Sequence, residues 1–448
     1  MKEKVLKFFN ELSKYPRPSG NEEAVANYLV DFAKKHNFYV YKDNFNNVLI
    51  KKENSNKEPI ILHSHTDMVC VSEPDYEVDF LSTPIKTVIE GDYLSAYKTS
   101  LGADNGMGVA IILTLLDENN DYNIEALFTT DEEVTMTGAT NFDYSLLKSK
   151  NLISLDGMSD CELINGCASI CDMKIKFKPN FKTDKKIGYC LKVKGLKGGH
   201  SGADINLNLG NSNNILIEIL SNLNNVELSQ IKGGDQFNFI ANYSKVYFAS
   251  SDFEQKFNEI KTDLIKQYPT LELTYEKVEL DKYLSVNDSK KLIDLLSQIK
   301  TGVIVGNNQK IVLSQNLSCI NLEEGLIKIS QRGHSEKEDE NNIQKLKSLA
   351  ENFDFNFEIF DKQKGFCTDE NSKLTKDLVE VYSNLFNKNL NVLNKHISLE
   401  AAIFKQKAPH IDIAIVSPKI LGAHSTKERV FIPSINTTYA LLQKFLNK

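Results

Sequence analysis

The chain has 448 residues, of which 41% are hydrophobic and 25% charged, the balance of a globular protein that folds in water. This length exceeds what one ordinary core supports and predicts two or three domains. The net charge of −7 argues against a nucleic-acid partner, which would favour a basic face. No run of 18 apolar residues occurs, so we expect no membrane-spanning segment and no membrane partner.

The first fifteen residues, Met1–Tyr15, carry apolar side chains at helical spacing. They lack the continuous apolar stretch of a signal peptide, so we expect an amphipathic first helix in a cytoplasmic protein. The seven cysteines are odd in number and no pair has CxxC spacing. We therefore expect reduced, buried thiols.

Residues 1–170 alternate helix and strand signals. In chain order we predict a helix, a hairpin, a buried strand ending in a site, a helix and two strands: Asn21–Lys35, Phe38–Lys52, the strand containing Ile60-Ile61-Leu62, Gly106–Leu116, Ile124–Thr129 and Asn151–Leu155. Strands separated by helices predict an α/β fold with a mostly parallel sheet covered on both faces.

Residues 171–365 change in character, since strand-like alternation dominates there. We predict strands at Met173–Phe177, Tyr189–Val193, Phe237–Phe248, Leu271–Val278, Ile311–Ile320, Leu326–Ser330 and Phe355–Phe360. Helical stretches lie between them at 212–224, 253–267, 288–299 and 336–351. This content predicts an inserted α+β domain made of two similar halves. The final segment, 366–448, returns to α/β character, with a helix, a buried strand and a closing helix: Asn371–Phe386, His410–Val416 and Thr437–Asn447.

Acidic and histidine side chains follow several of these elements. His65 and Asp67 end the strand that begins at Ile60, and residues two apart on a strand point to the same side. Asp67 could therefore hold the imidazole of a metal-bound His65, but this motif is weak by itself, and a solvated loop histidine is the alternative. Asp104 stands among glycines just before a helix, where it could bridge two cations or simply cap the helix.

Glu132 and Glu133 follow the strand that ends at Thr129. Adjacent carboxylates diverge in direction, so one can bind metal while its neighbour handles a proton; a solvated acidic turn is the alternative. Asp156 follows the next strand, and His424 follows the strand near the C-terminus. Each is unremarkable alone, but together the five elements occur in one order.

In that order the chain resembles the aminoacyl-histidine dipeptidases, a branch of the co-catalytic zinc exopeptidases. The resemblance runs over nearly the whole chain and is carried by the runs Tyr15–Glu23, His65–Val69, Leu101–Gly106, Asp131–Glu133, Gly166–Ala168, Leu196–Gly202 and Gly422–Ser425. It implies a zinc-exopeptidase catalytic domain in two parts, 1–170 and 366–448, and an inserted α+β lid domain, 171–365. It also implies a homodimer that forms through the lid, and small dipeptides as substrates.

The resemblance implies a role for each residue. Two Zn²⁺ ions would be held, one by His65, Asp104 and Asp156 and the other by Asp104, Glu133 and His424, with Mn²⁺ or Co²⁺ as substitutes. Asp67 would support His65, a cis peptide would join Asp104 to Asn105, and Glu132 would be the general base for a water that bridges the ions.

Further residues would contact the substrate, by the same resemblance. His200 would stabilise the oxyanion, Asn316 and Arg332 would lie near the substrate carboxylate, and His396 and Glu400 would line the pocket. A surface position is the alternative for Arg332. The implied reaction is hydrolysis of unblocked dipeptides, broadly of the Xaa-His type. A related aminoacylase or tripeptidase would share the metal residues, and a non-catalytic binding protein on the same fold is a third reading.

Overall fold

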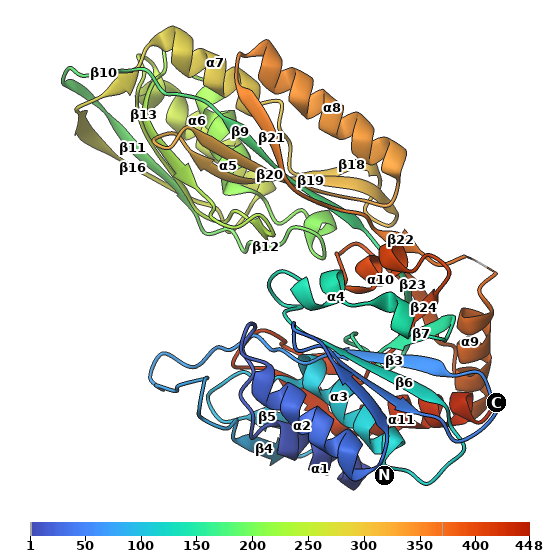
Figure 1. Cartoon of the computed structure of the whole chain (residues 1–448). Helices are drawn as coiled ribbons and strands as arrows, with labels where there is room; N and C mark the ends of the chain where they lie inside the picture. The colour runs from blue at the N-terminus through green and yellow to red at the C-terminus, as the bar shows by residue number, and fades with distance from the viewer. Residues whose placement is uncertain (1, 370) are drawn as a thin grey trace. The chain divides into compact units, whose positions relative to one another are not determined.

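The computed structural model describes residues 2–369 and 371–448 and divides the chain into two units (Figure 1). Unit 1 comprises Met1–Gly166, Phe366–Asn394 and Leu399–Lys448, and unit 2 comprises Cys167–Gly365 and Lys395–Ser398. Met1, which the sequence assigns to the first helix, lies outside the described residues. The short stretch Lys395–Ser398 packs with unit 2 because the Ala168 N–H lies 3.1 and 3.0 Å from the Lys395 and Ile397 carbonyl oxygens.

Unit 1 is built on a nine-stranded mixed sheet. Its order is β1 (Tyr39–Lys42), β2 (Val48–Lys52), β6 (Ile124–Thr129), β3 (Ile60–His65), β7 (Asn151–Ser154), β24 (Asp412–Ile415), β8 (Glu162–Cys167) and β22 (Phe366–Cys367), with β23 (Asn391–Lys395) also paired to β8. The four central strands β6, β3, β7 and β24 run parallel, and β1, β2 and β8 join antiparallel. The predicted parallel sheet is therefore confirmed in the centre of this unit.

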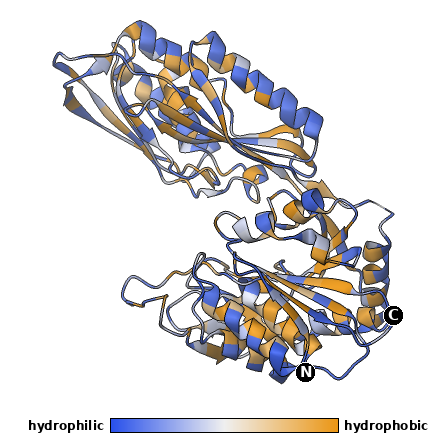
Figure 2. Ribbon diagram, viewed as in Figure 1, coloured by the Kyte–Doolittle hydropathy of each residue, from blue (hydrophilic) through white to orange (hydrophobic). Residues whose placement is uncertain are grey.

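Helices cover both faces of this sheet (Figure 1). On one face lie α1 (Lys2–Leu12), α2 (Glu23–Lys35), α3 (Ala103–Leu116) and α11 (Ile432–Leu446), and on the other α4 (Thr137–Asn141) and α10 (Ala401–Lys407), while α9 (Lys373–Phe386) packs against α11. A short 3-10 turn, Tyr144–Leu146, follows α4. Helix α3 is buried along its whole length, which explains why it is apolar on every side (Figure 2).

Unit 1 has a second, four-stranded sheet that was not predicted from the sequence. It has the order β25 (Ile420–Leu421), β26 (Arg429–Phe431), β5 (Tyr93–Ala96) and β4 (Thr87–Glu90). Strands of two to four residues are too short to show a period of two, so their pattern gives no signal. This sheet pairs the C-terminal segment with the chain just before α3.

Unit 2 consists of two halves with the same topology. The first half runs β11 (Lys186–Lys194), α5 (Ser212–Ser221), β13 (Glu227–Gly233), β15 (Ser244–Ala249), α6 (Phe253–Gln267) and β16 (Glu272–Leu280). The second runs β9 (Ser169–Lys176), α7 (Val286–Leu296), β19 (Ile311–Asn321), β20 (Leu326–Gly333), α8 (Glu336–Asn352) and β21 (Asn356–Gln363). In each half the strands, counted along the chain, lie in the order fourth, first, third, second, and β13 pairs with β19 to join them. The prediction of two similar halves is confirmed.

Smaller elements complete unit 2, and one prediction there is wrong. The extra elements are β10 (Phe181–Lys182), β12 (Gly199–His200), β14 (Phe239–Ile240), β17 (Tyr283–Leu284), β18 (Gly302–Gly306) and a 3-10 turn at Ile205–Leu207. The strand predicted at Phe237–Phe248 is split into β14 and β15. The carbonyl of Ala241 between them accepts the N–H of Ser212 at the start of α5, so this stretch leaves the sheet ladder.

None of the seven cysteines forms a disulfide, and burial holds for only part of the set. Cys167, Cys171, Cys190 and Cys319 are buried, whereas Cys161 and Cys367 are exposed and Cys70 is intermediate. The expectation of buried thiols is therefore wrong for the exposed pair. Cys161 stands just before β8, and Cys367 lies in β22, the strand at the edge of the unit 1 sheet. Across residues 2–369 and 371–448, no helix has both the length and the apolar character needed to cross a bilayer.

An aromatic cluster anchors the first half of unit 2. The Phe253 ring is 1% exposed, and its centroid lies 4.7 to 5.2 Å from those of Tyr189, Phe248, Phe257 and Tyr275. We predict that Phe253→Ala lowers the free energy of unfolding by about 3–5 kcal/mol, because the ring leaves a cavity that its neighbours cannot fill.

The matched control is Ile187→Ala, since Ile187 is 67% exposed on β11, and the expected loss there is less than about 1 kcal/mol. Urea unfolding followed by far-ultraviolet circular dichroism measures both variants, since the chain has no tryptophan. Equal losses in the two variants would contradict the assignment of the cluster as core.

Candidate metal centre

The candidate site of unit 1 is assembled from the ends of its parallel strands. His65 is the last residue of β3, Glu132 and Glu133 follow β6, and Asp156 stands two residues beyond β7. Loops at the carboxyl ends of adjacent parallel strands open at the same edge of a sheet, where ligands bind in α/β folds. The parallel pairing of β6, β3 and β7 in the sheet therefore brings these side chains together.

Two further side chains enter from outside the sheet. Asp104 stands at the start of α3, and His424 lies in the loop between β25 and β26, where its φ of 60° is left-handed. Asp104 Oδ1 lies 3.2 Å from His65 Nε2, and Asp104 Oδ2 lies 3.3 Å from His424 Nε2. The Asp104 carboxylate thus stands between two imidazoles, with one oxygen facing each.

The remaining acids surround these two rings. His65 Nε2 lies 3.7 Å from Asp156 Oδ1 and 3.9 Å from Glu132 Oε2. His424 Nε2 lies 3.0 Å from Glu133 Oε2, while Glu133 Oε1 is buried without a hydrogen-bond partner. The structure therefore gathers into one cluster all the residues that the resemblance implied as metal ligands.

This donor set fits divalent cations. Three groups have ligand atoms within 4.8 Å of one another: His65 with Asp104 and Asp156, Asp104 with Glu133 and His424, and His65 with Glu132 and Glu133. The first two share Asp104 and match the two implied ligand sets. Four clustered carboxylates exceed the charge that two imidazoles can balance, and buried charge needs a counter-charge. Imidazole nitrogen and carboxylate oxygen are ligands that suit zinc, manganese and cobalt.

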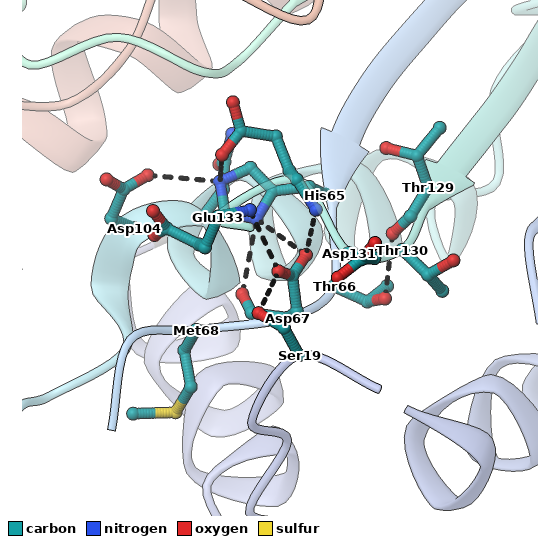
Figure 3. A network of polar contacts seen from close by, with 12 residues as sticks. Ser19, His65, Thr66, Asp67, Met68, Asp104, Thr129, Thr130, Asp131 and Glu133 are labelled. Carbon is teal, nitrogen blue, oxygen red and sulfur yellow. Dashed lines mark hydrogen bonds and ion pairs between the residues drawn. The ribbon is translucent and has the colours of Figure 1, made fainter. Parts of the chain in front are cut away.

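Asp67 lies beneath His65 and holds the neighbouring loop (Figure 3). Asp67 Oδ1 lies 3.3 Å from His65 Nδ1 and accepts the Glu132 N–H at 3.0 Å. Asp67 Oδ2 accepts the Glu133 N–H at 3.1 Å and the Ser19 hydroxyl at 2.7 Å. A carboxylate on the far ring nitrogen fixes the tautomer that leaves Nε2 free to bind a cation.

The pKa values of the cluster follow from its charges. Hydrogen bonds to Asp104 and Glu133 raise the pKa of His424 to about 10. Burial alone would lower the pKa of His65, but its hydrogen bonds to Asp104, Asp156 and Asp67 outweigh burial and raise it well above the usual range. Burial alone would raise the pKa of the Asp104 carboxyl, but the two imidazoles outweigh burial and lower it.

Glu132 behaves differently from its neighbours. Burial raises the pKa of Glu132 well above its usual range, and the negative charges of Asp156 and Glu133 add to the rise. A carboxyl group whose pKa is raised toward the working pH can both accept and return a proton near pH 7. The side chain is 12% exposed, so it is not a solvated surface acid.

Glu400 belongs to a second buried network in unit 1. Its side chain is fully buried, and Oε2 lies 2.9 Å from His63 Nε2 and accepts the Thr129 hydroxyl at 2.8 Å. The other nitrogen of His63 lies 3.0 Å from Ser154 Oγ. This network ties together β3, β6 and β7, the strands whose carboxyl ends lead to candidate metal ligands. The sequence singled out Glu400 for a substrate pocket and missed His63 as its partner.

His200, on β12 of unit 2, has a defined ring orientation. Its Nδ1 accepts the backbone N–H groups of Gly202 and Ala203 at 3.1 and 3.0 Å. A neutral ring whose Nδ1 accepts must carry its proton on Nε2. The backbone of this loop therefore selects the tautomer that donates a hydrogen bond through Nε2.

The other substrate-site candidates of unit 2 divide into two kinds. Arg332 is only 4% exposed, and its Nε and Nη1 have no hydrogen-bond partner; His396 lies near it, with Nε2 2.7 Å from Ser314 Oγ and Nδ1 unpartnered. Asn316 differs, because its amide oxygen accepts from Asn211 and its amide nitrogen donates to the Phe239 carbonyl. Arg332 and His396 thus keep unused polar atoms, whereas Asn316 is engaged within the fold.

Two acids that hold the site were missed from the sequence. Glu22 Oε1 accepts the N–H groups of Gly20 and Asp131 at 2.9 and 3.1 Å, and Glu428 accepts backbone N–H groups of the loop before α3. The only signal for Glu428 was its position four residues after His424. The expected cis peptide between Asp104 and Asn105 is present.

Comparison with known proteins identifies the family to which a chain with this site belongs. Residues 61–448 match the profile of peptidase family M20/M25/M40. The chain belongs to this family. The match covers every residue of the metal cluster, from His65 to His424.

Individual relatives extend over the whole chain. The cytosol non-specific dipeptidase of Escherichia coli K12 is 30% identical over 470 residues, covering 98% of this chain and 96% of the relative. The aminoacylhistidine dipeptidase of Vibrio alginolyticus has a crystal structure with a TM-score of 0.85 and 29% identity, covering 99% of this chain and 96% of that one. A tripeptidase of Staphylococcus aureus shares the fold, with a TM-score of 0.60 and 16% identity over 100% of this chain and 98% of that one.

The raised pKa values of His65 and His424 predict proton release on metal binding. Both rings are protonated near pH 7 in the metal-free protein, and each must lose its proton to coordinate a cation. We expect about two protons released per chain on saturation with Zn²⁺, and an affinity that rises with pH toward about 10. Calorimetric titration in buffers of different ionisation enthalpy measures the number; binding without proton release would show that the rings are already neutral without metal and would contradict this expectation.

Proposed function

We propose that this M20 family peptidase hydrolyses unblocked dipeptides, broadly of the Xaa-His type, with two divalent cations and with Glu132 as the general base. The observation that carries the proposal is the cluster around Asp104, in which one carboxylate faces two imidazoles at 3.2 and 3.3 Å. The dipeptidase relatives support the substrate class, since each aligns over nearly its whole length.

The ligands would divide into two sets that share Asp104. His65 and Asp156 would complete one set, and Glu133 and His424 the other. We propose Zn²⁺ as the native ion, because two imidazoles and carboxylate oxygens form a donor set that zinc enzymes use, with Mn²⁺ or Co²⁺ as substitutes. Such ions supply Lewis-acid activation of a water molecule and of the peptide carbonyl.

Glu132 would move the proton. Its carboxylate takes a proton from the attacking water and returns it to the nitrogen of the leaving amine, which completes hydrolysis without a covalent intermediate. The raised pKa of this buried group matches both halves of that task. Asp67 would orient His65 and, through two backbone N–H groups, keep Glu132 and Glu133 in place.

Unit 2 would supply the substrate contacts. We propose that His200 donates from Nε2 to the carbonyl oxygen of the scissile bond, and that Arg332 and His396 bind the substrate carboxylate end. Asn316 would support this site from within unit 2, where both ends of its amide are hydrogen-bonded. Glu400, buried in unit 1, would support the ends of β3 and β6 through His63 and Thr129. A homodimer formed through unit 2 and a cytoplasmic location complete the proposal, the latter supported by the cytosolic E. coli relative.

A substrate panel tests the proposed class. We expect hydrolysis of free dipeptides, Xaa-His among them, to exceed hydrolysis of tripeptides and N-acetyl amino acids by at least about tenfold in kcat/KM. Removal of metal with a chelator should abolish activity, and added Zn²⁺, Mn²⁺ or Co²⁺ should restore it. Preference for N-acetyl amino acids would instead identify an aminoacylase, and preference for tripeptides a tripeptidase.

Variants of the two neighbouring carboxylates, Glu132 and Glu133, distinguish a general base from a metal ligand. We expect Glu132→Gln to keep both metal ions and substrate affinity while kcat falls by at least about 10²-fold, the range for loss of a general base. Glu133→Gln should instead lower metal content and activity together, because a neutral amide is a weaker ligand.

Each variant serves as the control for the other, since the chemical change is identical at adjacent positions. Metal content by elemental analysis and steady-state kinetics measure both. Near wild-type turnover in Glu132→Gln would rule out the proposed base, whatever the metal content.

A further inference from the structure

One carboxylate, Glu428, accepts four backbone N–H groups of the loop that carries Asp104. Its Oε2 accepts from Leu101 at 2.8 Å and Gly102 at 2.9 Å, and its Oε1 accepts from Ala103 at 2.8 Å and Asp104 at 3.1 Å. The side chain is 2% exposed, so these bonds are shielded from water. A buried carboxylate with two bonds to each oxygen is strongly and specifically held.

The same loop is held from its other side. Arg17 Nη2 donates to the Gly102 carbonyl oxygen at 2.6 Å, and Arg17 is 1% exposed. A Cβ at Gly106 would lie 2.2 Å from Arg17 Nη2, so only glycine allows the guanidinium this close. Glu428 therefore binds the N–H groups of this loop and Arg17 binds one of its carbonyl groups. Both contacts are to the backbone, and neither uses a candidate metal-ligand atom.

Glu428 also belongs to the segment that carries His424. Both residues lie in the loop between β25 and β26, and the Glu428 N–H donates to the Ser425 carbonyl oxygen at 3.1 Å. The next strand, β26, pairs with β5. Glu428 thus connects two stretches of chain that lie more than 300 residues apart in the sequence. One stretch carries Asp104 and the other carries His424, and these two residues belong, with Glu133, to the same candidate metal-ligand group.

We propose that Glu428 is a positioning residue for the dinuclear centre, which sets the place of Asp104 relative to His424 by binding the backbone of residues 101–104. This inference rests on the proposed metal centre. Its physical basis is the loss that follows replacement by glutamine. The amide has one acceptor oxygen, and its NH₂ group would face backbone N–H groups, so part of the loop would lose its bonds and shift.

The test is metal binding by Glu428→Gln, with Co²⁺ as the probe. Metal-free wild-type protein and the variant are titrated with Co²⁺, and the stoichiometry, the affinity and the visible absorption of the bound ion are recorded. We expect the variant to bind at least one of the two ions about 10–100-fold more weakly, the range for loss of a group that supports a ligand, and with an altered absorption spectrum. Glu428→Asp keeps the charge on a shorter side chain and should recover part of the affinity.

A matched control is available in the same unit. Glu125 is also a 2% exposed carboxylate that accepts backbone N–H groups, from Lys148 and Ser149, but it stands one residue into β6, at the strand end opposite the metal cluster. Glu125→Gln should lower the unfolding temperature yet leave Co²⁺ affinity and spectrum unchanged. This contrast separates positioning of the ligands from general loss of stability.

The outcomes distinguish the two levels of the proposal. Wild-type protein that binds no Co²⁺ would overturn the proposed metal centre. Wild-type protein that binds two ions, with unchanged affinity and spectrum in Glu428→Gln, would overturn only the role of Glu428. Equal weakening by Glu125→Gln would also overturn it. If Glu428→Gln fails to fold, as judged by circular dichroism, Glu428→Asp decides the question, and wild-type affinity in that variant counts against the proposal.

Discussion

The accumulation of negative charge around Asp104 is the constraint on which the rest of the site depends. Four carboxylates converge with two imidazoles in a largely buried space, with interatomic distances of 3.0 to 3.9 Å. Buried like charges repel strongly unless cations or protons offset them. The surrounding carboxylates raise the pKa of both histidine rings, which favours their protonated forms, and a pair of divalent cations would replace those protons. The electrostatics of the arrangement, as well as its residue types, thus favour the binding of metal ions.

A crowded charge cluster keeps its geometry only if the loops beneath it are fixed. Three buried acids that are not metal ligands do this through backbone N–H groups: Glu22 at Asp131, Asp67 at Glu132 and Glu133, and Glu428 at residues 101–104. These bonds fix the main chain beside the cluster and leave the side chains of Asp104, Glu132 and Glu133 free to face it. The backbone N–H groups stabilise the ionised form of each acid, and at Asp67 the His65 ring does so as well.

Unit 2 adds a different kind of order. Its two halves share one strand arrangement and meet where β13 pairs with β19. Within this frame, backbone N–H groups select the Nε2–H tautomer of His200, and Arg332 keeps buried donors without partners. A pre-set donor and a guanidinium with two unpartnered nitrogens fit the proposed roles in binding a carbonyl and a carboxylate.

The sequence by itself singled out the strand-end residues of the site, because His65 ends an apolar strand and Glu132, Glu133 and Asp156 each follow one. Their roles were implied by the resemblance of the whole ordered set to a known family. The sequence also indicated the α/β and α+β segments and the duplication in unit 2, since these depend on local periodicity. Only the tertiary structure decided which side chains support them. Glu428 meets Asp104 across more than 300 residues, and His63 meets Glu400 in the same way. Such contacts depend on how distant segments pack, and no local pattern encodes them.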